Sequence, residues 1–463
     1  MRQVLLAAAI LMAPVLGCAP ASPALLRPVS ATLAQRGLPA LAPVAPGQTR
    51  PSAAVAELLR RPLTLDAAVR VALAQNRRLQ AEIEELGIAA AELTAATLPP
   101  LQLSATYHLD TVEVDALADV IGLLELAGRR RAARSQLDGA TAGVAVRAIQ
   151  LAAEVELAFG GVQLARARVA LRQHAFDAAA AAALVRERAF EAGGGTELAL
   201  ARQLDQRETA RSRLGRAQLE LELARERLGR AMGVWGADAP WSVAEAPPAL
   251  PAAAPALDEL EREAVAHSLE VERARAAARA GAQEVGLARL RRWLPRLGVG
   301  AVAETVDGSW ELGPAVSLSL PLTGEATAAE LRGRGRLRRA EHELYASAVE
   351  LRSAARSARL SALGAYSEAA HLRDVVVPLR QRILDETVRH YNAMNADTFT
   401  LLAAQQELVD GQDLLLEATA RFAEAMAQVS ALRRGVLPDA MRQAPAQEPS
   451  MPAAETPSLH VLH

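Results

Sequence analysis

The chain has 463 residues, of which 51% are hydrophobic but only 3% are aromatic, so its apolar residues are mainly Ala, Leu and Val. This composition favours helix, and the length allows two or more domains or one large repeated structure. The formal net charge of −2, with 22% charged residues interspersed along the chain, gives no indication of nucleic-acid binding.

The first 17 residues have the pattern of a secretory signal, with a basic start, an apolar run and a small Gly17 at the end. Cys18 follows directly and is the only cysteine, so no intrachain disulfide can form. A cysteine at this place resembles the bacterial lipoprotein cleavage site, although Val15 and Leu16 stand where Leu and a small residue are usual. We predict a lipid anchor on Cys18. The alternative is an ordinary signal peptide followed by an incidental cysteine.

Residues 18–62 are rich in Pro, Ala and Leu without steady periodicity, and we interpret them as an extended, lipid-anchored tether or a strap lying on the body. A helical pattern runs from Leu65 to Leu98, where two prolines end it. Two short alternating stretches follow, residues 101–109 and roughly 120–126. They predict a β-hairpin over 101–126.

A very long helix is predicted to begin at Gly128 and to continue to about Ala192, a length of ~96 Å at 1.5 Å per residue. The glycines at 193–195 predict a turn, and a return helix is expected from Glu197 to Met232. Residues 63–233 therefore form a first repeat, and the Pro-rich residues 234–256 are predicted to be a linker.

The same order recurs over residues 257–435, with a helix to Trp293, a β-hairpin over 297–322, and a long helix over 326–392. A second tip near 392–398 precedes the return helix. The offset from Gly128 to Gly324 is 196 and that from Phe190 to Tyr391 is 201, so the second long helix is predicted to be five residues longer. The order indicates a tandem duplication. Residues 436–463 are predicted to be a disordered tail.

The second return helix carries a sustained 3-4 apolar seam, which is typical of a coiled coil. Its two columns are Leu401, Leu408, Leu415, Phe422 and Val429, and Ala404, Gly411, Ala418, Ala425 and Leu432. The second column is mostly Ala or Gly, so neighbouring backbones are expected to pack closely along it.

The four predicted strands raise the question of a membrane, because no stretch after the signal has the ~20 apolar residues of a transmembrane helix. Four strands alone leave open edges, which a bilayer does not tolerate, so a barrel has to be completed by other subunits; three chains would supply twelve strands. The alternative is a soluble antiparallel sheet packed on a helical bundle. Few aromatics, only Tyr107 and Trp310 in the strands, favour that alternative. The signal and helices of about 100 Å favour the barrel.

Nearly the whole mature chain, about residues 63–435, resembles the TolC-type outer membrane factors. The matching stretches are LTLDAA at 63–68, ALAQN at 72–76, LPPL at 98–101, FEAG at 190–193, LSLPL at 318–322 and the tip at 391–405 with its LLAAQ. The resemblance implies a mainly α fold with a small β part, a homotrimer with a twelve-stranded transmembrane β-barrel, and a periplasmic helical tunnel. It also implies docking to a periplasmic adaptor and an inner-membrane transporter, and a location in the outer membrane of a Gram-negative bacterium.

The resemblance places a gate and adaptor-docking site at the two tips. The candidate residues are Gly193, Gly194, Gly195 and Glu197 in the first tip and Tyr391, Asn392, Asp397 and Thr400 in the second. Where the family often has aspartates after the second tip, this chain has Thr400 and Ala403, and the usual tip glycine is Met394. Asp397 is the nearest carboxylate, with Glu197 as its rough counterpart. One hypothesis is that three copies of Asp397 ring the closed mouth; the alternative is an acid that favours a helix start.

No enzymatic function is expected, because neither the serines nor Cys18 has a catalytic setting. The eight histidines show no metal-ligand spacing, and the 193–195 glycine run follows no strand as a phosphate loop would. No cofactor is expected apart from the lipid on Cys18. The predicted function is a passive, gated exit duct of a tripartite efflux or type I secretion-like system. The alternative is a lipid-anchored periplasmic coiled-coil adaptor or scaffold without channel activity.

Overall fold

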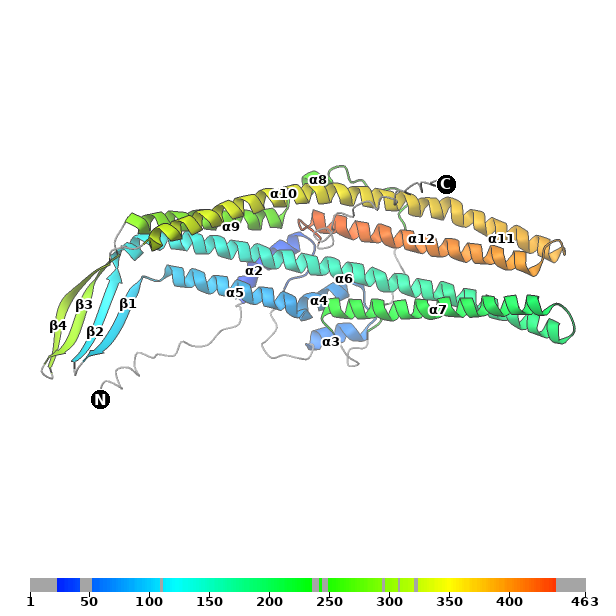
Figure 1. The fold of residues 1–463 in the computed structure, drawn as a ribbon, viewed down its shortest axis with the longest axis horizontal. Coiled ribbons are helices and arrows are strands. Elements are labelled where there is room, and N and C mark those ends of the chain that lie inside the picture. The colour runs from blue at the N-terminus through cyan, green and yellow to red at the C-terminus, as the bar shows by residue number, and fades with distance from the viewer. Residues whose placement is uncertain are drawn as a thin grey trace, which may run out of the picture.

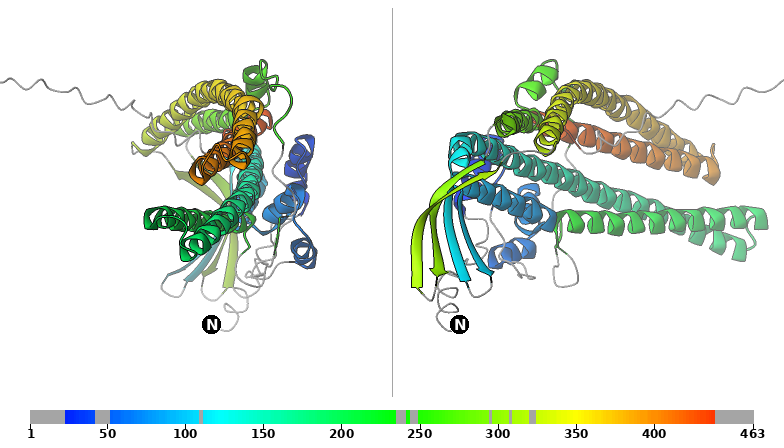
Figure 2. Two further views of the ribbon diagram at one scale, coloured as in Figure 1. Left: turned by 90° about the vertical axis from the view of Figure 1, so that its right-hand side faces the viewer. Right: turned by 60° about the vertical axis from the view of Figure 1, so that its left-hand side comes forward.

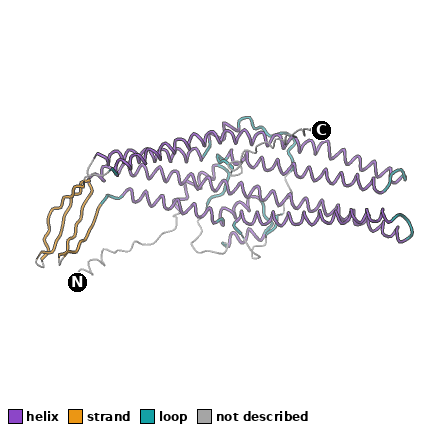
Figure 3. The backbone as a smooth tube through the Cα atoms, in the orientation of Figure 1, coloured by secondary structure: helices purple, strands orange, loops and turns teal. Residues whose placement is uncertain are grey.

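The computed structural model describes residues 23–41, 52–108, 111–234, 241–243, 249–293, 296–306, 309–319 and 324–438. The described chain is long and mainly helical, with a four-stranded sheet at one end and the tips of two helical hairpins at the other (Figure 1). Figure 3 shows the same separation of strands from helices. The prediction of a mainly α fold with a small β part, built as a tandem repeat of long hairpins, is confirmed. Cys18, the 307–308 turn and residues 439–463 lie outside the described residues.

Each repeat consists of a helical lead-in, a β-hairpin, a very long helix, a tip and a return helix. The first comprises α4 (Leu65–Gln75), α5 (Arg77–Thr97), β1 (Leu101–His108), β2 (Thr111–Asp119), α6 (Val120–Glu191) and α7 (Glu197–Met232). The second comprises α8 (Leu260–Ala266), α9 (Leu269–Trp293), β3 (Arg296–Val306), β4 (Ser309–Ser319), α10 (Glu325–His371), the π-helical η1 (Leu372–Val376), α11 (Val377–Asn392) and α12 (Thr398–Arg433).

The helices form a curved layer in which α7, α6, α12 and α11 follow one another, as the view along their axes shows (Figure 2, left). Within this layer α5 continues the line of α7, and α9 continues the line of α12 (Figure 1). At the first junction the Asn76 amide nitrogen donates to the Ala231 carbonyl at 3.1 Å, and Gly233 turns the chain with φ +72°. At the second junction the Leu269 amide donates to the carbonyl of Gly435, whose φ is +80°. A left-handed glycine and a hydrogen bond between the two helix ends thus recur at both junctions, as expected of a duplication.

Where the structure describes the predicted tether or strap, the segment is helical rather than extended, and it packs on the body as a strap. Helices α2 (Pro23–Gln35) and α3 (Ala53–Arg60) lie beside α4 on one side of the curved layer (Figure 2). Leu26, Val29 and Leu33 are 0–2% exposed and join the largest hydrophobic core together with α4 and α6. These three residues have i, i+3, i+7 spacing on one helix face. A face of only three residues is too short to be recognised in the sequence of a Pro-rich segment.

The first β-hairpin differs from the prediction. Its second strand is β2 rather than residues 120–126, and α6 begins at Val120 instead of Gly128. The Asp119 carboxylate accepts a hydrogen bond from the Gly122 amide at 2.9 Å, so it caps α6 and turns the following apolar run into helix.

The sequence predicts that the five extra residues of the second repeat lie in its long helix, and this prediction is wrong. The helix α6 has 72 residues, whereas its counterpart from Glu325 to Asn392 is shorter. Strands β3 and β4 have 11 residues each, against 8 and 9 in β1 and β2. The second repeat therefore gains its length in the hairpin.

The strands form one antiparallel sheet in the order β1-β2-β3-β4, and their register places apolar residues on one face. For example, Leu101 pairs with Ala118, Ala118 with Val299, and Val299 with Val316. The intervening positions are mostly polar, such as Ser104 opposite Asp115. The apolar face is exposed: Leu312 is 81% exposed and Val316 is 72% exposed. Among the described residues, no helix is both long and apolar enough to cross a membrane.

The predicted seam of α12 is buried in the structure. Its small-residue column packs inward, with Ala404, Gly411, Ala418 and Ala425 all buried. In the other column Leu408, Phe422 and Val429 are buried, whereas Leu401 and Leu415 are half-buried. The seam lies against α6 on one side and α10 and α11 on the other.

Candidate functional site: the hairpin tips

The two predicted tips lie side by side at the end of the molecule opposite the sheet (Figure 1). The contact between them is a cation–π interaction in which the Arg202 guanidinium of α7 lies 5.7 Å from the ring centre of Phe399 in α12. This contact involves two residues that the sequence had not singled out, and it is not made by the predicted site residues themselves.

The first tip is a glycine turn. Gly193 and Gly195 have φ angles of +78° and +106°, which residues with a side chain rarely adopt. The Gly194 amide donates to the Ala189 carbonyl at 2.7 Å and closes α6. The Thr196 hydroxyl accepts from the Ala199 amide at 3.2 Å and starts α7. Glu197 is therefore the first helical residue rather than the cap.

The second tip repeats one left-handed position and the helix cap of the first tip with different residues. Met394 takes the left-handed position with φ +59° and is 93% exposed, although it is not a glycine. Asp397 caps α12, because its Oδ1 accepts from the Thr400 amide at 2.8 Å and from the Thr400 hydroxyl at 2.6 Å. These bonds, the hydroxyl bond first, lower the pKa of Asp397 below its ordinary value. The counterpart of Asp397 in the first tip is Thr196, and not Glu197 as the sequence had suggested.

Apolar side chains are exposed at both tips. Phe190 and Leu198 flank the first turn with 38% and 61% of their surface exposed, and Tyr391 in the second tip is 39% exposed. Met394 is the fourth exposed apolar residue at the tips, and these four residues are called the apolar tip surface below. Asn392 ends α11 beside it.

Behind the tips, an ionic cluster that the sequence did not predict joins the two hairpins. Arg168 and Arg172 of α6 both bind the carboxylate of Asp413 in α12, at 2.7 and 2.5 Å. Arg168 also contacts Glu220 of α7 at 3.2 Å, and Arg172 contacts Asp410 at 3.5 Å. Burial alone would raise the pKa of Asp413, but the two guanidinium groups outweigh it and hold that pKa below its ordinary value.

The cluster had a weak signal in the sequence. Arg168 and Arg172 are spaced i, i+4 and Asp410 and Asp413 are spaced i, i+3, so each pair lies on one helix face. The two arginines and the two aspartates are more than 230 residues apart along the chain, so one sequence does not reveal that they meet. Within the described residues, no group of three His, Cys, Asp or Glu side chains lies close enough to hold a metal ion.

The long helical hairpins and the four-stranded sheet recur in solved structures of bacterial membrane proteins, which share this fold. A membrane protein from Pseudomonas aeruginosa matches with a TM-score of 0.68 and 19% identity, over 87% of this chain and 97% of that one. The outer membrane protein VceC from Vibrio cholerae matches with a TM-score of 0.66 and 16% identity, over 80% of this chain and 96% of that one. The outer membrane channel CmeC from Campylobacter jejuni matches with a TM-score of 0.63 and 15% identity, over 80% of this chain and 86% of that one.

The comparison confirms the resemblance that the sequence suggested at the level of the fold. Of the three matched proteins, CmeC is an outer membrane channel and VceC is an outer membrane protein. No protein-family model matches the sequence, and the comparison with curated proteins found no match. The fold similarity therefore rests on the arrangement of the helices and strands.

Proposed function

We propose that the protein is a passive outer-membrane exit duct, and that three copies assemble into one channel. The observation that carries this proposal is the exposed apolar face of the sheet. In a soluble protein such a face would be covered by helices, but Leu101, Leu312 and Val316 are 70%, 81% and 72% exposed. A strand that alternates apolar and polar residues, with the apolar ones outside, is the pattern of a transmembrane barrel.

The two outer edges of the sheet support the trimer. Strands β1 and β4 each pair on one side only, so their other edges carry unpaired backbone groups. A bilayer requires those groups to be paired. If β4 of one copy pairs with β1 of the next, three copies close a barrel of twelve strands. The strand lengths of 8 to 11 residues are close to the 9–11 that span a bilayer.

The membrane-facing role of the apolar face is tested by two adjacent substitutions in β4. Val316→Arg places a charge on the apolar face, whereas Ser317→Arg places the same charge on the polar face. We expect Val316→Arg to reduce the heat-resistant trimer in the outer-membrane fraction strongly, because an arginine facing lipid costs about 2–4 kcal/mol at mid-depth. Ser317→Arg is expected to assemble normally. Equal assembly of both variants would favour a soluble sheet, and with it the periplasmic scaffold.

The apolar tip surface supports docking to a periplasmic adaptor that links the duct to an inner-membrane transporter. Phe190, Leu198, Tyr391 and Met394 expose their side chains at the end of the molecule furthest from the sheet. An exposed cluster of this kind is typical of a protein-binding site. Opening would then require the tips to separate, which involves the contact between Arg202 and Phe399.

Asp397 is proposed to form an acidic ring at the closed mouth, in addition to capping α12. The two roles separate by substitution, because asparagine is as good an N-cap as aspartate but carries no charge. Asp397→Asn is expected to keep the helix start and to weaken cation selectivity and cation block in reconstituted channels. Asp397→Ala removes both the cap and the charge. If Asp397→Asn leaves selectivity and block unchanged, Asp397 is a cap alone.

The lipid anchor on Cys18 remains a proposal, as does the outer membrane as the site of action. Cys18→Ser expressed beside the parent chain, followed by intact-mass measurement, tests it. A mass increase of the parent that matches a diacylglyceryl group and an acyl chain, absent in Cys18→Ser, is the expected result. An unmodified mature chain would indicate an ordinary signal peptide.

A further inference from the structure

A groove of about 1460 Å³ lies on the layer where α7, α6 and α12 meet the junction of α4 and α5. Its floor exposes the backbone of α6 at Gly160 and Gly161, where an added Cβ atom would meet no other atom within 4 Å. Leu157 and Leu164 flank this floor, and Leu416 and Met426 of α12 belong to the opposite wall. The groove therefore has an apolar base that is open to ligands.

The floor of the groove lies on the side of α6 that faces away from the α2–α4 core. In α6, Ala148, Ala152 and Val155 belong to that core. At about 100° per residue, Leu157 and Gly161 lie roughly half a turn round the helix from them. Leu157 and Gly161 are thus on the side of α6 that is turned away from this core.

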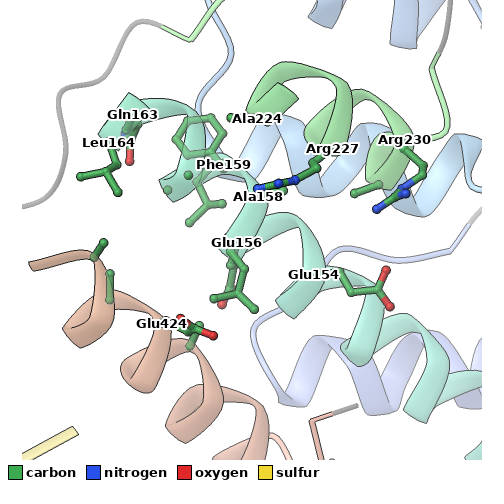
Figure 4. Close-up of a pocket in the computed structure, with 18 of the residues that line it drawn as sticks. Glu154, Glu156, Ala158, Phe159, Gln163, Leu164, Ala224, Arg227, Arg230 and Glu424 are labelled. Atoms are coloured by element: carbon green, nitrogen blue, oxygen red, sulfur yellow. The ribbon is translucent and has the colours of Figure 1, made fainter. Parts of the chain in front are cut away.

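The charges at the groove are unequal. Glu154 is paired with Arg147 at 2.9 Å, and Glu156 is paired with Arg434 at 2.7 Å. Figure 4 shows Arg227 and Arg230 extending from α7 and Glu424 extending from α12. Among the described residues, the side chains of Arg78, Arg227 and Arg230 have no ion-pair partner. Three unpaired guanidinium groups against the single carboxylate of Glu424 leave the groove positive.

We propose that this groove binds small organic anions with an apolar body, of the class of aromatic sulfonates and carboxylates. The apolar body would lie over Gly160 and Gly161, and the acidic group would bind Arg227 and Arg230. Guanidinium groups bind such oxyanions by paired, charge-assisted hydrogen bonds. The binding does not depend on channel activity. If such anions are a class of cargo that the duct carries, that part of the inference rests on the proposed function.

The test uses the full-length protein in lipid nanodiscs and the fluorescent probe 8-anilinonaphthalene-1-sulfonate, with empty nanodiscs as the reference. N-phenyl-1-naphthylamine, which has the same rings without the sulfonate, is the neutral comparison. We expect saturable binding of the sulfonate that Arg227→Gln/Arg230→Gln weakens about tenfold, since a hydrogen bond to a charged group contributes that much or more. Binding of the neutral probe to the same variant is expected to be unchanged.

Two further variants separate the groove from the rest of the surface. Gly161→Leu fills the groove with a residue of higher helix propensity, so it should fold and lose binding of both probes. Arg216→Gln is the matched control, because Arg216 lies on the same face of α7 three turns away and outside the groove. It should bind like the parent. Each variant is first checked for an unchanged helical circular dichroism spectrum.

The proposal is overturned if the sulfonate shows no saturable binding above empty nanodiscs, or if either groove variant binds it as tightly as the parent does. Ion conductance of the same preparation is measured in parallel. A conducting protein without sulfonate binding would contradict the anion groove and leave the channel intact. Binding without conductance would support the groove and contradict the duct.

Discussion

Glu125 and Glu330 occupy the same position in the two repeats, although 205 residues separate them. Each is the sixth residue of a long helix, α6 or α10, and they are only 5% and 4% exposed. Both bind arginines of α9: Arg291 reaches Glu125 at 2.8 Å, and Arg289 and Arg292 reach Glu330 at 3.2 and 3.1 Å. Helix α9 therefore ties the two repeats together directly below the sheet.

Glu125→Gln tests this tie. Glutamine keeps the shape of the side chain but leaves Arg291 without its carboxylate partner. We expect the free energy of unfolding to fall by about 1–3 kcal/mol, the range for a lost hydrogen bond to a charged group. The measurement is denaturant unfolding of the purified protein. Glu191→Gln, at the exposed end of α6, is the control and should change stability little. Equal stability of the two variants would contradict the role of the tie.

The junction between α9 and α12 is predicted to be sensitive to one methyl group. Gly435 has φ +80°, and an added Cβ would overlap the carbonyl of His267. Arg36 of α2 donates to the carbonyls of His267 and Arg434 at the same place. We expect Gly435→Ala to lower the unfolding temperature markedly, because strain and a steric clash add together.

Gly37 provides the control for that prediction. Its φ of +74° is similar, but an added Cβ would meet nothing within 4 Å. Gly37→Ala should therefore report the backbone strain alone, about 1 kcal/mol. A thermal melt of both variants in the same detergent separates the two effects. If Gly37→Ala is as destabilising as Gly435→Ala, the clash with His267 contributes nothing.

Asp413→Asn is expected to loosen α12 from α6. Its carboxylate is the shared acceptor of Arg168 and Arg172, so the substitution should cost about 1–3 kcal/mol. Because the pKa of Asp413 is depressed in the folded protein, its contribution to stability is present above the unfolded pKa of about 3.9. That contribution is lost as the pH falls through the lower folded pKa.

The pH dependence is measured as the difference in unfolding free energy between the parent and Asp413→Asn at pH 7 and below pH 4. The difference should be largest at pH 7 and should shrink in acid. Asp205→Asn, an exposed aspartate of α7, is the control and should show no such trend. A constant difference across this range would mean that the charge of Asp413 is not what joins the helices.

The two tips offer a pair of substitutions with opposite expected effects. Gly193 and Met394 hold the same left-handed position, with φ +78° and +59°. Gly193→Ala should destabilise the first tip by about 1 kcal/mol, whereas Met394→Gly should relieve strain in the second. Amide hydrogen exchange at the tips reports both locally: faster exchange near 193 and slower exchange near 394 are expected. If the exchange rate changes in the same direction at both tips, Gly193 and Met394 are not equivalent.

Much of the fold could be predicted from local signals. The return helix α7 has the predicted bounds because Thr196 caps its start and Gly233 ends it. The seam of α12 was readable because Leu408, Phe422 and Val429 repeat over several turns. The second strand of the first hairpin was placed wrongly. The apolar run after Asp119 is consistent with strand or helix, and the cap at Asp119 decides between them.

The candidate site was predictable in its place but not in its interactions. Turn residues marked both tips, but the contact between the two hairpins there is made by Arg202 and Phe399, which no local signal marked. The ionic cluster around Asp413 depends on which helices are neighbours, and this follows from the tertiary fold rather than from local spacing. Helices α2 and α3 of the predicted tether were missed for a related reason, since their short apolar faces can be recognised only against the helices on which they pack.

The most direct test of the proposed duct is single-channel conductance of the purified protein in a planar bilayer, combined with its mass in detergent. The account predicts a trimer with a small, cation-selective conductance. A monomer without conductance would contradict it, and the lipid-anchored coiled-coil scaffold would then be the better explanation of the fold.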